Sequence, residues 1–181
     1  MATNPRYDPA RRDRIIDACL DVIAERGVAG TTHRRVAEAA GVPLGSMTYH
    51  FDGMDELLRA AFTRFSHEIA DGFEARLGQD MTREEAKDAV VDLIQQDVFA
   101  GHRELVLSHE LYTLAARDQR YRELTSARMT RSRVALEHHF DAMTAQLLDA
   151  LIEGLSIHSA LDVTPTDRAL IREAVDRVVG P

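Results

Sequence analysis

The segment Thr32–Leu58 constrains the fold of this chain more than any other. It has the pattern of two short helices joined by a glycine-containing turn, followed by the start of a third helix. Gly41 stands where the chain must turn sharply, and Pro43 opens the next helix, where its missing N–H has no cost. The apolar positions spaced to bury one face of this hairpin are Val36, Ala37, Ala40, Met47 and Phe51.

The outer face of the second short helix is polar and aromatic. We expect Ser46, Thr48, Tyr49 and His50 to point outward. The first short helix begins Thr32-His33-Arg34-Arg35, which places donors where a phosphate could meet free backbone N–H groups. This pattern predicts a helix-turn-helix that presents its second helix to the DNA major groove, although an ordinary helical hairpin would share the glycine turn.

The charge of the chain is unevenly distributed. The 181 residues carry a net charge of −8. Residues 1–60 hold 8 Arg and 9 acidic residues, a net charge of −1, and the remaining 121 residues carry −7. Because an acidic surface repels DNA, we expect any DNA contact to be confined to the near-neutral N-terminal region.

Cysteine and hydropathy patterns indicate a cytoplasmic protein. Cys19 is the single cysteine, which excludes a disulfide framework within one chain and favours a buried, inert thiol. We find no N-terminal apolar run like a signal peptide and no apolar run of membrane-spanning length.

Helical periodicity runs almost throughout the sequence, so we predict an all-α fold of about nine helices. The first helix, ended by Gly27, would complete a three-helix head with the helix-turn-helix. A long helix from Met54 to about Leu77 would be shared between this head and a helical body. A capping box at Thr82–Glu85 would begin another helix, which Gly101 ends. Two further helices are expected at 103–116 and 119–140.

The last two helices indicate a dimer. Residues 143–161 carry two apolar stripes, whereas a helix buried on one side needs only one. We expect this helix and the last one to pair with their copies as a four-helix interface, although a buried central helix in a monomer is the alternative. The interface residues predicted are Ala150, Gly154, Ile157, Leu161, Ile171, Val175 and Val178.

Several short motifs occur together in the N-terminal third of the chain. They are the stripe of Ile15, Ala18, Val22 and Ile23, then Gly27, Thr31–Thr32, Val36–Ala37, Ala40–Gly41–Val42, Gly45–Ser46–Met47, Tyr49–His50–Phe51 and Leu57–Leu58. In this combination, residues 11–71 resemble the DNA-binding domain of the TetR-type bacterial transcriptional regulators.

The resemblance implies a helix-turn-helix at residues 32–51 within a DNA-binding domain at 11–71, and a ligand-binding and dimerisation domain at 72–181. Thr32 and His33 would meet phosphate, and Arg34 would reach a base, guanine being its natural partner. Pro43, Leu44, Gly45 and Ser46 would open the recognition helix. The positions implied to contact phosphate and sugar are Thr48, Tyr49 and His50.

Two positions depart from the family pattern. Thr48 stands where Tyr is common, and Met54 stands where Lys often makes a charge-assisted phosphate contact. Because Leu44 and Gly45 offer few hydrogen bonds to bases, part of the specificity is expected from contacts with thymine methyl groups and from DNA shape.

The resemblance also implies the mode of action, a homodimeric repressor that binds a palindromic operator and is released by a small apolar or amphipathic ligand. The residues predicted to line its pocket are Phe62, Phe65, Ile69, His109, Tyr112, Met129, Met143 and His158. No cofactor or metal is expected, because His138 and His139 are adjacent and would diverge by about 100° on a helix. We expect the arginines at 117, 120, 128 and 131 to form a solvated face.

Two other classes of protein compete with a regulator. An enzyme is disfavoured, since the sequence has no Gly-rich phosphate loop, no G-x-S-x-G, no H-E-x-x-H and no context for a nucleophilic cysteine. A helical adaptor whose helix-turn-helix contacts protein remains the third possibility. Salt-dependent binding to DNA upstream of its own gene would separate the regulator from both.

Overall fold

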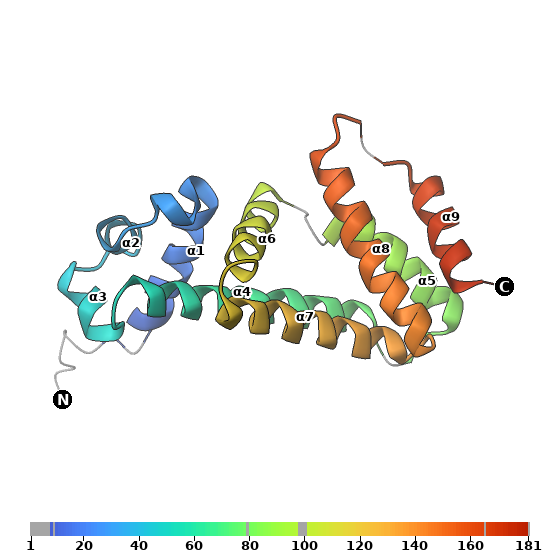
Figure 1. Cartoon of the computed structure of the whole chain (residues 1–181), viewed down its shortest axis with the longest axis horizontal. Coiled ribbons are helices and arrows are strands. Elements are labelled where there is room, and N and C mark those ends of the chain that lie inside the picture. The colour runs from blue at the N-terminus through green and yellow to red at the C-terminus, as the bar shows by residue number, and fades with distance from the viewer. Residues whose placement is uncertain (1–7, 9, 79, 98–100, 165, 181) are drawn as a thin grey trace. The chain divides into compact units, whose positions relative to one another are not determined.

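The computed structural model describes residues 8, 10–78, 80–97, 101–164 and 166–180. All regular structure within these ranges is helical, with nine α-helices and one π-helical segment, which confirms the predicted all-α fold. The chain divides into two compact units, of which the first ends at Phe65 and the second begins at Ser66 (Figure 1). The division therefore falls inside one continuous helix, α4 (Met54–Arg76).

The first unit consists of α1, α2, α3 and the beginning of α4. The three new helices span Arg11–Gly30 (α1), His33–Ala39 (α2) and Gly45–His50 (α3). They pack around one apolar core, as predicted from the periodicity. Its most deeply buried members are Ile15, Cys19, Leu20, Ile23, Val36, Met47, Leu57, Phe62 and Phe65.

Two glycines adopt backbone angles that other residues rarely tolerate. Gly27 has φ 68° and interrupts the helical run of α1, where the sequence predicted the end of the first helix. Gly41 has φ 63° in the turn between α2 and α3. A side chain at either position would strain the backbone, because L-residues are disfavoured at positive φ.

The second unit contains the rest of α4 and six further segments. They are α5 (Arg83–Asp92), the π-helix η1 (Leu93–Asp97), α6 (His102–Ala115), α7 (Gln119–Glu137), α8 (Ala142–Leu161) and α9 (Arg168–Val179). The predicted helix that starts at Thr82 thus changes to π-helical geometry at Leu93, and its predicted core residue Val98 lies outside the described residues.

Side-chain caps explain where these helices begin. Asp118, Asp141 and Asp167 each accept a backbone N–H in the first turn of α7, α8 and α9. At the start of α5 the predicted capping box is present, since Thr82 accepts from the Glu85 backbone N–H and the Glu85 carboxylate accepts from that of Thr82. Each cap satisfies a backbone donor that the helix leaves free.

The core of the second unit is shared by α4, α5, η1, α7, α8 and α9. Its central members are Leu77, Val90, Ile94, Leu136, Leu148, Ile152, Ile171 and Val175. Ile171 and Val175 have no exposed surface within the single chain. The prediction that these two residues lie in a dimer interface is therefore wrong, because the apolar stripe of α9 packs inward.

Ion pairs fasten α9 onto α5 at the edge of this core. The Lys87 ammonium lies 2.6 Å from the Asp176 carboxylate, and Arg172 lies 2.6 Å from Asp88. The Lys87 side chain is only 11% exposed, so solvent screens its pair less than an ordinary surface pair.

Cys19 lies in the core of the first unit, where burial raises the pKa of its thiol to about 12. This confirms the buried position predicted for the cysteine, and the thiol stays protonated at neutral pH. No helix in the described ranges is both long enough and apolar enough to cross a membrane.

The capping box of α5 gives a first test of this fold. We expect Thr82→Ala to lower the free energy of unfolding by about 1 kcal/mol, because the Glu85 backbone N–H loses its acceptor and the Glu85 carboxylate loses the Thr82 hydroxyl as a donor. Urea unfolding followed by circular dichroism measures the change. Thr113→Ala, at an exposed site inside α6, is the matched control and should change stability little. Equal losses in the two variants would contradict a special role for the cap.

Candidate nucleic-acid interface and internal cavity

The helix-turn-helix is held together by its apolar face. Val36 and Met47 are fully buried, and Phe51 is nearly so. The Val42 backbone N–H donates to the Ala37 carbonyl over 2.9 Å and closes the turn. The two helices are therefore fixed relative to each other, which leaves their opposite faces free to meet a ligand.

The polar residues in the N-terminal turn of α2 fall into two groups, according to whether their side chains are hydrogen-bonded within the fold. Thr32 caps the helix by accepting from the Arg35 backbone N–H over 3.3 Å, and the Arg35 guanidinium donates to the Gly30 carbonyl. Arg34 instead is exposed, and His33 is half-buried. Arg35 is thus engaged in the fold, whereas Arg34 points where it can reach an external group.

The outer face of α3 carries an exposed aromatic group. Tyr49 is 84% exposed, and its ring meets the His50 ring edge-on with centroids 4.9 Å apart. Leu44 is 51% exposed at the start of the helix, and the Thr48 hydroxyl donates to the Gly45 carbonyl over 3.2 Å. An aromatic ring held this far into solvent is typical of a contact surface.

One predicted orientation is wrong. Ser46 is only 8% exposed, so its side chain does not point outward, and a contact from this position would have to use the backbone. The other positions predicted on this surface are exposed or half-buried: Thr32, His33, Arg34, Pro43, Leu44, Gly45, Thr48, Tyr49 and His50.

Polar contacts to α1 secure α3 and α4 within the first unit. Arg64 of α4 binds two carboxylates of α1, contacting Asp17 at 2.7 Å and also Asp13. The Arg12 guanidinium lies over the Phe51 ring at 4.9 Å from its centroid. These contacts fix the frame from which Arg34 and Tyr49 project.

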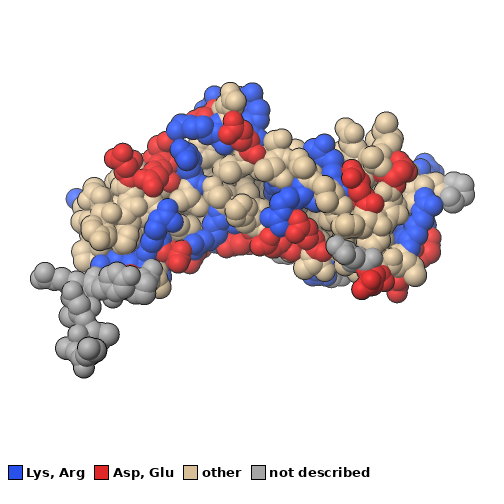
Figure 2. Space-filling model, turned by 90° about the horizontal axis from the view of Figure 1, so that it is seen from below, with Lys and Arg blue, Asp and Glu red and all other residues tan. Residues whose placement is uncertain are grey.

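Charges on the molecular surface are mixed. On the face that Figure 2 shows, Lys and Arg side chains lie among Asp and Glu side chains and form no continuous basic area. This face therefore presents no broad positive field.

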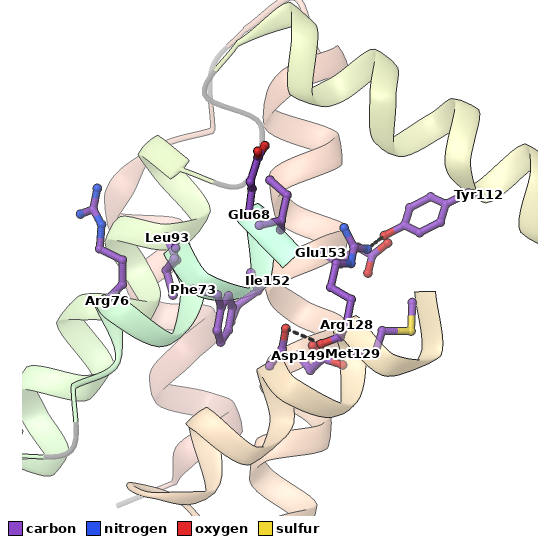
Figure 3. Close-up of a pocket in the computed structure, with 13 residues that line it drawn as sticks. Glu68, Phe73, Arg76, Leu93, Tyr112, Arg128, Met129, Asp149, Ile152 and Glu153 are labelled. Carbon is purple, nitrogen blue, oxygen red and sulfur yellow. Dashed lines mark hydrogen bonds between the residues drawn. The ribbon is translucent and has the colours of Figure 1, made fainter. Parts of the chain in front are cut away.

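The second unit contains a cavity of about 240 Å³ that opens partly to the surface (Figure 3). It lies among α4, η1, α6, α7 and α8. The lining residues are Glu68, Ile69, Gly72, Phe73, Arg76, Leu93, Tyr112, Arg128, Met129, Ser132, Asp149, Ile152 and Glu153.

The predicted pocket residues are only partly brought together. Ile69, Tyr112 and Met129 of the predicted set line this cavity. The prediction is wrong for Phe62 and Phe65, which are buried in the first unit, and for Met143 and His158, which are exposed. His109 does not line the cavity either, and its Nδ1 lies 2.8 Å from the Leu105 carbonyl oxygen. Periodicity had identified apolar stripes without showing which stripe faces a void.

One polar residue that lines the cavity, Arg128, was not predicted there. Arg128 is 8% exposed, whereas the sequence placed it on a solvated face. Its guanidinium donates to the Tyr112 hydroxyl and lies over the Tyr112 ring, 5.3 Å from the centroid. The Tyr112 hydroxyl is also hydrogen-bonded to Glu153, and burial raises the pKa of Tyr112.

Arg131, another member of that predicted solvated face, makes tertiary contacts. It binds Asp71 and Glu74 of α4, each at 2.6 Å. These ion pairs join α7 to α4 one turn from Arg128.

Asp149 is a half-buried acid beside this group. Burial raises its pKa to about 6, and the repulsion of Glu153 acts in the same direction, while Arg133 and Arg128 oppose the shift. The Arg133 Nε lies 3.2 Å from the Asp149 Oδ2. The sequence did hold a signal for this site, since Asp149 and Glu153 stand four residues apart as the two acidic residues of a largely apolar helix.

The residues that could suggest a metal do not converge. Within the described ranges, no group of three or more His, Cys, Asp or Glu side chains is arranged to hold a metal ion. The rings of His138 and His139 lie 6.4 Å apart, and His138 is exposed.

Comparison with known proteins agrees with this architecture. Residues 15–61 match the family model described as bacterial regulatory proteins, tetR family. The chain is 24% identical over 179 residues to the HTH-type transcriptional regulator PksA of Bacillus subtilis (strain 168), covering 91% of this chain and 86% of PksA.

Two crystal structures extend the likeness over the whole chain. SCO7518 of Streptomyces coelicolor A3(2), described as a candidate transcriptional regulator, is 55% identical with a TM-score of 0.88, covering 96% of this chain and 100% of that chain. The multidrug binding protein EbrR complexed with ethidium is 30% identical with a TM-score of 0.77, covering 94% and 99%.

The helical fold and its exposed helix-turn-helix thus define a DNA-binding transcriptional regulator. With these relatives matched over nearly their full length, the chain belongs to the TetR family of bacterial regulatory proteins.

The pKa of Asp149 tests the geometry of the cavity. We expect Arg133→Gln to raise this pKa above its value of about 6, because Arg133 is the strongest of the groups that lower it. Carboxyl ¹³C NMR over a pH titration measures the shift. Asp141, whose pKa is lowered by its hydrogen bonds to Thr144, serves as an internal control. An unchanged Asp149 titration would show that the ion pair is absent in solution.

Proposed function

We propose that this regulator is a homodimeric repressor that binds a palindromic operator and is released by a small ligand bound in the second unit. The observation that carries this proposal is the fixed helix-turn-helix with Arg34 and Tyr49 exposed on its outer side. The assignment of residues 11–71 to DNA binding and 72–181 to ligand binding and dimerisation belongs to the same proposal.

DNA recognition is proposed to combine a few polar contacts with shape. In a two-fold dimer, the two α3 helices would enter successive major grooves about 34–36 Å apart. Arg34 would pair with guanine, while Leu44 would contact thymine methyl groups. The phosphate and sugar contacts are assigned to Thr32, His33, Thr48, Tyr49 and His50, with Pro43, Gly45 and Ser46 approaching through the backbone.

The dimer interface is proposed on the outward stripe of α8. Leu147 and Leu161 are 49% and 62% exposed, and Ala150 lies between them. A Cβ added at Gly154 would meet nothing within 4 Å inside the chain, so a second helix could approach closely there. Ile157 and Val178 are half-buried at the edge of this stripe, and Leu170 of α9, 55% exposed, extends it in place of Ile171 and Val175.

Ligand control is proposed to act through α4. Ile69, Gly72 and Phe73 of this helix line the cavity, and Arg131 ties it to α7 through Asp71 and Glu74. Earlier residues of α4 belong to the DNA-binding unit. A ligand that binds one arrangement of α4 better than the other would shift the population of heads able to bind the operator. The similarity to EbrR, described as a multidrug binding protein complexed with ethidium, supports a ligand-binding role for this chain.

The DNA contacts can be tested once the operator is known from a genome-wide pull-down of bound DNA. We expect Arg34→Ala and Tyr49→Ala each to weaken operator binding by roughly tenfold or more, because each removes an exposed contact without disturbing the core. Fluorescence anisotropy measures the affinity. Arg177→Ala, exposed on α9, is the control and should bind like the wild type. Wild-type binding by both variants would exclude the assigned contacts.

The interface can be tested by filling the space beside α8. We expect Gly154→Gln to convert the dimer into a folded monomer, because the added side chain fits the single chain but blocks a partner helix. Sedimentation at micromolar concentration measures the mass. Ala127→Gln, at an exposed site on α7, is the control and should remain dimeric. A monomeric wild-type protein would refute the proposed dimer.

A further inference from the structure

The cavity of the second unit already contains a cation. Arg128 is largely withdrawn from water, and its guanidinium donates to the Tyr112 hydroxyl, with its Cζ 5.3 Å from the centroid of the Tyr112 ring (Figure 3). Burying a guanidinium is costly unless nearby groups compensate for its lost hydration. Here the compensation comes from an aromatic face and from the carboxylates around it.

Acidic groups outnumber basic ones in the lining of this cavity. Asp149 and Glu153 stand one turn apart on α8, and Glu68 joins them from α4. The basic members are Arg128 and Arg76. Tyr112 connects the two kinds of group, since its hydroxyl bonds both Arg128 and Glu153. The Tyr112 hydroxyl therefore links the Arg128 guanidinium to Glu153, one of the two acidic residues on α8.

Space in the cavity is limited by its own side chains. Its volume of about 240 Å³ falls slightly below the roughly 300–1,000 Å³ of most ligand pockets. A long arginine side chain can turn its charged end toward solvent while its stem stays against apolar surface. Movement of Arg128 would free both the Tyr112 face and the room that its guanidinium fills.

We propose that Arg128 is a resident cation that occupies the charge site of the ligand, and that the effector is a small aromatic cation which displaces it. The incoming ring would stack on Tyr112 near Phe73, and its positive charge would lie beside Asp149 and Glu153. This inference rests on the ligand-responsive function proposed above and specifies the chemistry of the ligand.

Charge balance favours a cation over an anion. Exchange of one buried cation for another leaves the charge of the cavity unchanged, and it returns a guanidinium to water, where it is better hydrated. A cation–π contact is regained when the ligand ring replaces Arg128 over Tyr112. An anion would instead enter a wall of three carboxylates and would find Arg128 already engaged with Tyr112.

Two planar three-ring probes of opposite charge test the proposal on the full-length protein without DNA. Proflavin is the cation, and anthracene-9-carboxylate is the anion of matched size. Fluorescence titration should show that the wild type binds proflavin more tightly. We expect Arg128→Gln to tighten proflavin binding by roughly tenfold, and Glu153→Gln to weaken it by a similar factor, because each changes one charge at the site.

Further variants separate charge from packing. Arg128→Lys keeps the positive charge and should bind proflavin within a few-fold of the wild type, while Arg177→Gln on the surface of α9 should leave binding unchanged. Thermal unfolding identifies any variant that fails to fold, and if Arg128→Gln fails to fold, the expected loss of proflavin binding in Glu153→Gln decides the matter. The inference is overturned if proflavin does not bind, if Arg128→Gln weakens its binding, or if the anion binds tighter and depends on Arg128.

Measuring whether proflavin releases the operator distinguishes this inference from the proposed function. If proflavin binds with the expected pattern but does not release the operator, the cation site stands and ligand-controlled repression is wrong. If operator binding is intact and the variants do not show the pattern, the cation site is wrong and DNA binding stands.

Discussion

The DNA-binding unit depends on burial of the apolar side of two very short helices. Helices α2 and α3 have seven and six residues, and isolated helices shorter than about 12–15 residues are marginal in water. Their stability therefore comes from Val36, Met47 and Phe51, which are buried against the rest of the unit. Because this packing fixes the backbone, Arg34 and Tyr49 are presented at defined positions. Side chains that are to contact DNA at defined positions need a rigid, well-packed backbone beneath them.

The second unit combines a packed apolar core with an internal cavity. Its core joins residues from six segments, and the α5–α9 ion pairs close one edge of it. The cavity lies at another edge, where α4, α7 and α8 present charged groups as well as apolar ones. The positive charge of Arg128 balances the negative charge of the acidic residues in the cavity when no ligand is bound. The site therefore favours a cation that can take the place of the arginine side chain.

Local chemistry made much of the fold predictable. The glycine turn at Gly41, the break at Gly27 and the capping box at Thr82–Glu85 each act within a few residues, and all are present in the structure. The change to π-helical geometry at Leu93 was missed, because no local signal marks it. The outward face of α3 was predicted correctly except at Ser46. Its burial was missed because it depends on neighbours distant in the sequence.

The sequence by itself determined the helices, the helix-turn-helix and the family, because periodicity, caps and spaced motifs are properties of neighbouring residues. Only the tertiary structure decided which stripe of α9 is buried and which stripe of α8 is exposed. It alone brought Arg128 of α7, Tyr112 of α6 and Glu153 of α8 together. These residues are far apart in the chain, so their meeting depends on how whole helices pack, which periodicity along one helix does not encode.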